Sequence, residues 1–169
     1  MFLYCLILQK AGQRLFLRYI YANKTNDQSY MFERLFDFTY YLIHTYRVIV
    51  EYVKKGHQET CKLYEVSAEH PEKPDNPSYI LSKQKIAKGY KYTFFVSKTN
   101  NSVTLDDKTP DANQIEGAID NLIKILADTA KKHQEKNIQN YQELQFDAFF
   151  AEFSGTNTQV LSETEKNSR

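Results

Sequence analysis

Three short runs of strand-forming residues in the middle of the chain constrain the fold most. They cover residues 79–86, 90–98 and 102–105, and short links at residues 88–89 and 99–101 join them. The runs are rich in tyrosine, phenylalanine, valine and isoleucine, which favour strands, while glycine and asparagine in the links suit tight turns. This pattern predicts an antiparallel meander.

Two further pairs of strands are indicated upstream. Residues 2–9 (FLYCLILQ) and 15–21 (LFLRYIY) flank a link that contains Gly12, which predicts a β-hairpin. Residues 47–53 alternate like a strand but also continue a helical stripe, so both interpretations stay open. Their β-branched content favours a strand, with residues 60–66 as its return.

Two long helices frame the meander. Apolar and aromatic residues recur at helical spacing from Met31 to Tyr46, after a polar segment that contains capping residues. Thr109-Pro110 starts the second helix, whose apolar face runs from Ile115 to Ala130 and whose last turn is basic. A shorter helix is predicted to carry Phe146, Phe149, Phe150 and Phe153.

These elements fit one α+β domain with an antiparallel five-stranded sheet. A chain of 169 residues can bury one core, and we place the domain at residues 1–153. Residues 67–78 hold three prolines among polar residues and predict a surface loop within it. Residues 154–169 are polar and predict a flexible tail.

No motif in the chain points to catalysis. The sequence lacks a nucleophile elbow, a zinc-protease motif and a phosphate-binding glycine loop, and its four histidines are scattered. The cysteines, Cys5 and Cys61, lie far apart and predict two buried thiols. We therefore expect no catalytic residue, no metal and no cofactor.

Charge and hydropathy narrow the class of partner and the compartment. A formal net charge of +1 provides no overall field for nucleic acid, so we expect no nucleic-acid partner. The apolar run at residues 2–8 is too short to span a bilayer and has no basic segment before it. These features predict a cytoplasmic protein, with peripheral contact to endomembranes left open.

Two surfaces are candidates for binding. Aromatic residues surround the first helix almost completely, which indicates either burial on two sides or a face kept for a partner. Separately, an acid-free stretch carries Lys83, Lys85, Lys88 and Lys91 among aromatic residues. These lysines could contact anionic lipid. We favour the simpler interpretation that they protect strand edges, because no arginine accompanies them.

The order of these elements resembles the longin or SNARE-like domain of vesicle SNAREs, adaptor sigma chains and small TRAPP subunits. Residues 2–21, 30–43, 90–107 and 115–130 carry the resemblance, which covers about two thirds of the chain. It implies a five-stranded sheet with the first helix on one face, and a partner bound beside that helix. The partner-binding residues would be Phe32, Leu35, Phe36, Tyr40 and Ile43.

The chain departs from the longin pattern in two places. Residues 47–78 are longer than the usual link after the first helix, and no SNARE heptads follow Phe153. These departures favour an adaptor, tether or assembly subunit over a fusion SNARE. The leading hypothesis is a non-catalytic protein-interaction subunit of a hetero-oligomeric vesicle-trafficking, tethering or adaptor assembly.

Two rival hypotheses come from other classes of protein. The first is a small-molecule sensor of PAS-like or profilin-like architecture, which would need an enclosed cavity lined by Tyr92, Phe94 and residues of the first helix. The second is an enzyme with a dispersed site, which would need a cleft where histidine, aspartate and tyrosine side chains converge.

Overall fold

The computed structural model describes residues 28–109 and 112–150. The predicted hairpin at residues 2–21 and the predicted tail at 154–169 lie outside the described residues. The elements follow in the order α3 (Gln28–His44), β1 (Val48–Lys55), β2 (Gln58–Glu65), β3 (Tyr79–Lys85), β4 (Tyr90–Val96), β5 (Asn101–Leu105) and α4 (Ala112–Glu135). Residues 141–150 form a further helical segment.

The five strands form one antiparallel sheet in the order β1-β2-β3-β4-β5, which confirms the predicted α+β class. All five of these strands lie between Val48 and Leu105. The stretch that fitted both helix and strand is β1, whose Val50 pairs with Leu63 of β2.

The end of α3 explains why the helical stripe does not continue into β1. Tyr46 has a positive φ of 55°, and the amide of Arg47 donates to the carbonyl of Leu42 at 3.0 Å. The amide of Tyr46 donates to the carbonyl of Ile43 at 3.1 Å. Together these bonds form a Schellman motif, which closes the helix and turns the chain into the sheet.

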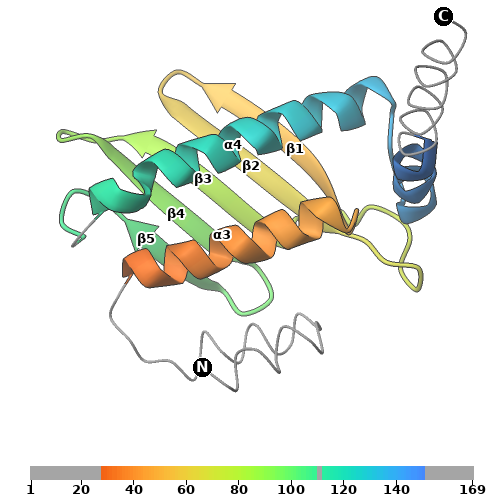
Figure 1. The fold of residues 1–169 in the computed structure, drawn as a ribbon, viewed down its shortest axis with the longest axis horizontal. Coiled ribbons are helices and arrows are strands. Elements are labelled where there is room, and N and C mark those ends of the chain that lie inside the picture. The colour runs from red at the N-terminus through yellow and green to blue at the C-terminus, as the bar shows by residue number, and fades with distance from the viewer. Residues whose placement is uncertain (1–27, 110–111, 151–169) are drawn as a thin grey trace, which may run out of the picture.

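Both long helices cover the same face of the sheet (Figure 1). α4 packs mainly on β1, and α3 packs on β5 and beside α4. Alternate residues of every strand point into this layer, as a pleated sheet requires. The core includes Leu35 and Leu42 of α3, Leu63 and Phe94 of the sheet, and Leu126 of α4.

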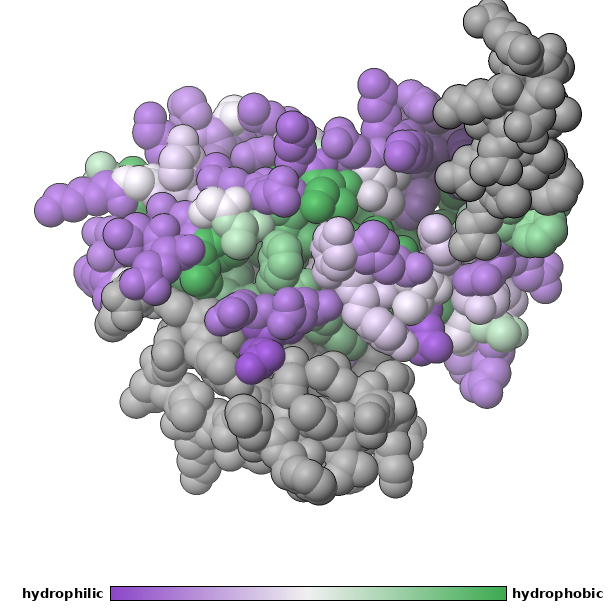
Figure 2. All heavy atoms as spheres, viewed as in Figure 1, coloured by the Kyte–Doolittle hydropathy of each residue, from purple (hydrophilic) through white to green (hydrophobic). Residues whose placement is uncertain are grey.

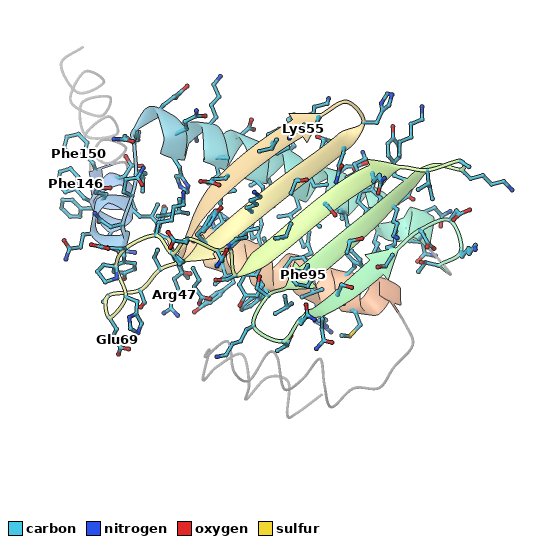
Figure 3. All side chains as sticks on the ribbon, turned by 180° about the vertical axis from the view of Figure 1, so that it is seen from behind. Arg47, Lys55, Glu69, Phe95, Phe146 and Phe150 are labelled. Carbon is cyan, nitrogen blue, oxygen red and sulfur yellow. The ribbon has the colours of Figure 1, made fainter. Side chains whose placement is uncertain are left out.

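Among the described residues, the opposite face of the sheet is covered at one end only. After α4 the chain passes around the edge of β1, and Ile138 and Leu144 pack against Ile49, Tyr64 and Val66. Figure 3 shows the helical segment 141–150 at this end, with the strands of the remaining face in front of α3 and α4. The proline-rich loop is tied to the same end, because Pro71 accepts a hydrogen bond from the amide of Tyr141.

Candidate functional site

The partner-binding residues predicted on α3 divide between the core and the surface. Phe32 and Leu35 are buried, which corrects their placement on a binding face: they belong to the stripe that meets the sheet. Phe36 and Ile43 are partly buried at the margin of the core, and Tyr40 is 40% exposed. Of the five predicted residues, only these last three can contribute surface beside α3.

The outer side of α3 carries a row of contacting rings. The centroids of Phe36 and Tyr40 lie 6.0 Å apart in a stacked arrangement, and those of Tyr40 and His44 lie 4.1 Å apart. These residues are four positions apart, so they share one side of the helix. Figure 2 shows a band of apolar surface between α3 and α4. Ile115 of α4 and Phe36 are among the partly buried residues packed against the core.

A second aromatic surface lies on the helical segment 141–150, and we call it the phenylalanine surface. Its residues Phe146, Phe149 and Phe150 are 65%, 63% and 58% exposed. Phe146 and Phe150 contact each other with ring centroids 5.8 Å apart, and Figure 3 shows both directed away from the sheet.

The phenylalanine surface lies on the side of the segment that faces away from the sheet. The buried side of the segment is made of Leu144 and Ala148, with Tyr141 partly buried beside them. Leu144 and Ala148 are four residues apart and already define a helical stripe. Apolar residues on two sides of one helix were the signal in the sequence for this exposed surface.

The two aromatic surfaces lie at the same end of the sheet. α3 ends beside the start of β1, where Tyr41 and Tyr46 are each 36% exposed. The segment 141–150 packs on Ile49 and Tyr64 at that same end, on the opposite face. Exposed aromatic side chains therefore occur on both faces of this end of the domain.

The lysines predicted to contact lipid do not form one group. The ammonium of Lys83 lies 2.8 Å from Asp120 Oδ1 and 4.1 Å from the centre of the Tyr90 ring, and its side chain is only 15% exposed. It is therefore paired within the domain and corrects that part of the prediction. Lys85, Lys88 and Lys91 are exposed at the turn between β3 and β4.

Glu51 forms a small polar cluster on the sheet face that carries the segment 141–150. The hydroxyl of Tyr64 donates to Glu51 Oε2 at 2.9 Å, and the ammonium of Lys73 binds the other oxygen. Burial raises the pKa of Glu51, but the bonds from Lys73 and Tyr64 outweigh it and hold the pKa below its usual value. Burial and the bond to Glu51 raise the pKa of Tyr64 to about 12. This cluster joins the loop to the sheet.

His133 closes part of the exposed edge of β1. Its Nδ1 accepts a hydrogen bond from the amide of Val50 at 3.1 Å, so this edge amide is satisfied by a side chain. Burial lowers the pKa of His133 to about 4, which keeps the ring neutral and able to accept. A cavity of about 380 Å³ lies here, lined by β1, by the end of α4 and by Lys73.

This cavity differs from the one that a small-molecule sensor would require. Tyr92 and Phe94 are each 1% exposed and pack within the core between the sheet and the helices. Neither lines the cavity at the edge of β1.

Burial raises the pKa of the Cys61 thiol to about 12, with a smaller contribution from Glu59.

Among residues 28–109 and 112–150, no three histidine, cysteine or acidic side chains are grouped closely enough to hold a metal ion.

By its fold and its exposed side chains, this protein is a two-layer α+β domain with aromatic surfaces at one end. Models of known protein families, curated proteins and solved structures give no match to the chain. Within the described ranges, no helix has the length and apolar character required to cross a bilayer.

Proposed function

We propose that this chain is a non-catalytic protein-interaction subunit of a hetero-oligomeric assembly. The phenylalanine surface carries the proposal, because three large apolar rings on one short segment are more than half exposed. Burying a phenylalanine side chain contributes about 1.5–3 kcal/mol, so a partner that covered these rings would gain substantial free energy. Aromatic residues are also enriched in the cores of protein interfaces.

The row of rings on α3 supports the same role. Tyr40 is exposed and stacks on Phe36, which like Ile43 is partly buried against the core. A tyrosine presents a large surface with little conformational entropy to lose, which suits it to recognition. The packed surroundings of Tyr92 and Phe94 also favour a protein-binding role over a small-molecule sensor.

The kind of assembly is proposed from the sequence pattern alone. The resemblance to longin domains supports a subunit of a vesicle-trafficking, tethering or adaptor complex, in the cytoplasm and peripheral to endomembranes. A shared fold would not by itself assign that process, so the binding surface has to be tested first.

The test compares proteins recovered with the intact chain and with a variant of the phenylalanine surface. We expect Phe146→Ser with Phe150→Ser to lose specific partners, since both rings are exposed and their loss leaves the core intact. The matched control is Gln142→Ser with Gln145→Ser, which changes polar residues of the same segment. Thermal unfolding of each variant checks that the domain is folded.

Quantitative mass spectrometry of the recovered proteins decides the outcome. Partners that are lost with the phenylalanine variant and kept with the glutamine control support the proposal. Tyr40→Asp tests α3 in the same way. Recovery of identical proteins at equal levels with all four forms of the chain would show that neither aromatic surface binds partners.

A further inference from the structure

The end of the sheet opposite the aromatic surfaces is formed by two neighbouring hairpin turns. The β1–β2 turn contains Gly56 and the β3–β4 turn contains Gly89, both with positive φ as such tight turns require. Gln58 of β2 pairs with Gln84 of β3, so the two turns lie side by side (Figure 1). We call residues 54–59 and 85–91 the hairpin tips.

The hairpin tips carry an excess of positive charge. Their five lysines are all exposed, whereas Glu59 is their only carboxylate. Figure 2 shows hydrophilic side chains over this part of the molecule, at the upper left. Asp106 and Asp107 follow β5 near the tips and are themselves followed by Lys108. Asp106 accepts hydrogen bonds from the backbone amide of Lys108 and from the hydroxyl of Thr109. The tip lysines are Lys54, Lys55, Lys85, Lys88 and Lys91.

Protection of a strand edge does not account for the lysines of the β3–β4 turn. β3 and β4 are interior strands of the sheet, with β2 on one side and β5 on the other. Their turn extends beyond its neighbours, because β4 pairs with β5 only from Tyr92 onward and β3 pairs with β2 only as far as Gln84. The β1–β2 hairpin stands beside it, with Lys54 and Lys55 at the end of the edge strand β1, before its glycine.

The lysines point to both sides of the sheet. Lys54 and Lys85 share the alternation of the strand residues that face the helices, while Lys55 and Lys91 share that of the opposite face. Lys88 lies in the turn itself. A peptide bound along one face of the sheet would contact only some of the five lysines. A flat surface that approaches the ends of the strands would contact all five.

Apolar and aromatic groups accompany the lysines at or directly beside the same tips. Val53 and Tyr90 are 42% and 39% exposed, and Ile86 is partly exposed in the second turn. Side chains of this kind can enter the interfacial region of a bilayer while lysines remain at the head groups. The combination fits a lipid surface better than a polyanion in solution.

From this geometry we infer that the two hairpin tips form a contact site for the surface of an anionic lipid bilayer. The strands then point away from the membrane surface and do not lie parallel to it. The site is separate from the aromatic surfaces and does not depend on the proposed protein-binding role. Lysine side chains near an anionic bilayer add attraction that falls off within a Debye length, so the contact is sensitive to salt.

The experiment measures binding of the full chain to vesicles by flotation. The probe is phosphatidylcholine containing phosphatidylserine, compared with phosphatidylcholine alone. Each lysine near such a surface contributes a factor of about five, so Lys54→Ser with Lys55→Ser should weaken partitioning about 25-fold. Lys88→Ser with Lys91→Ser should have a similar effect through the second tip.

The matched control removes the same charge elsewhere. Lys131 and Lys132 are exposed in the last turns of α4, away from the tips, so Lys131→Ser with Lys132→Ser should leave partitioning within a few fold. Phe146→Ser with Phe150→Ser should bind vesicles as the unaltered chain does, which separates this site from the proposed protein-binding role.

Four results would overturn the inference. These are equal binding to both kinds of vesicle, binding that persists at high salt, an equal loss in the α4 control, and binding of a single-stranded oligonucleotide in place of vesicles through the same lysines. The last result would assign the tips to nucleic acid.

Discussion

Two partly buried ionisable side chains should influence the stability of this domain in opposite directions as the pH changes. Burial raises the pKa of Glu65 to about 7, and the charges of Arg47 and Lys98 and a hydrogen bond with Tyr79 reduce this rise without cancelling it. Burial lowers the pKa of His133 to about 4, partly opposed by the charge of Asp147. The unfolded values are 4.5 for glutamate and 6.5 for histidine.

The sign follows from counting protons between pH 4.5 and 6.5. In the folded domain Glu65 is protonated and His133 is neutral, whereas in the unfolded chain Glu65 is ionised and His133 is charged. Folding therefore gains a proton at Glu65, and stability from that group falls as the pH rises. Folding loses a proton at His133, and stability from that group rises with pH. The two contributions nearly cancel in the unaltered domain.

Glu65→Gln should remove the contribution of Glu65 to the pH dependence of stability and leave that of His133. The difference in unfolding free energy, variant minus unaltered domain, should then increase with pH between 4.5 and 6.5. One proton corresponds to about 1.4 kcal/mol per pH unit, but solvent screening of a partly exposed carboxyl reduces the total change to about 1–2 kcal/mol. All other ionisable groups cancel in the difference unless they interact with Glu65.

Urea unfolding followed by circular dichroism at several pH values within this window measures the difference directly. A difference that stays constant, or that decreases as the pH rises, would show that Glu65 is not held in its protonated form. In that case the account of burial at this end of the sheet would be wrong.

Three further changes test the packing. Thr39→Val should raise stability by about 1 kcal/mol in thermal unfolding, because the buried Oγ1 of Thr39 has no hydrogen-bond partner within the described part of the chain; a loss of stability would reveal a bond. Leu35→Ala should lower stability by about 2–5 kcal/mol, whereas Tyr40→Ala should change it by less than about 1 kcal/mol in urea; equal losses would contradict the assigned burial. Tyr64→Phe should raise the pKa of Glu51 in an NMR titration by removing a bond to its ionised form; an unchanged pKa would rule out that contribution.

Local sequence patterns predicted most of the elements because their causes are local. The α4 helix follows from its apolar spacing and basic last turn, and the meander follows from strand-forming runs separated by short turns. The ambiguity at residues 47–53 is resolved by Tyr46, whose left-handed conformation ends α3. Residues other than glycine adopt the left-handed conformation only with support from the surrounding structure, so the sequence alone did not specify it at Tyr46.

The candidate surfaces were less predictable, because burial depends on which side of an element meets its neighbours. Phe32 and Leu35 have the character of binding residues but face the sheet. Lys83 belongs to an acid-free stretch, yet Asp120 approaches it from α4, a helix distant in sequence. Such contacts join residues that no local window contains.

The sequence by itself determined the class of the fold, the positions of the meander and its flanking helices, and the lysines of the β3–β4 turn. The tertiary structure alone decided that Leu144 and Ala148 meet the sheet while the larger phenylalanines of the same segment remain exposed. It also placed Lys54 and Lys55 beside the lysines of the second turn. The physical reason is that strand order and the path of the chain around β1 fix which side chains become neighbours, and both depend on packing across the whole domain.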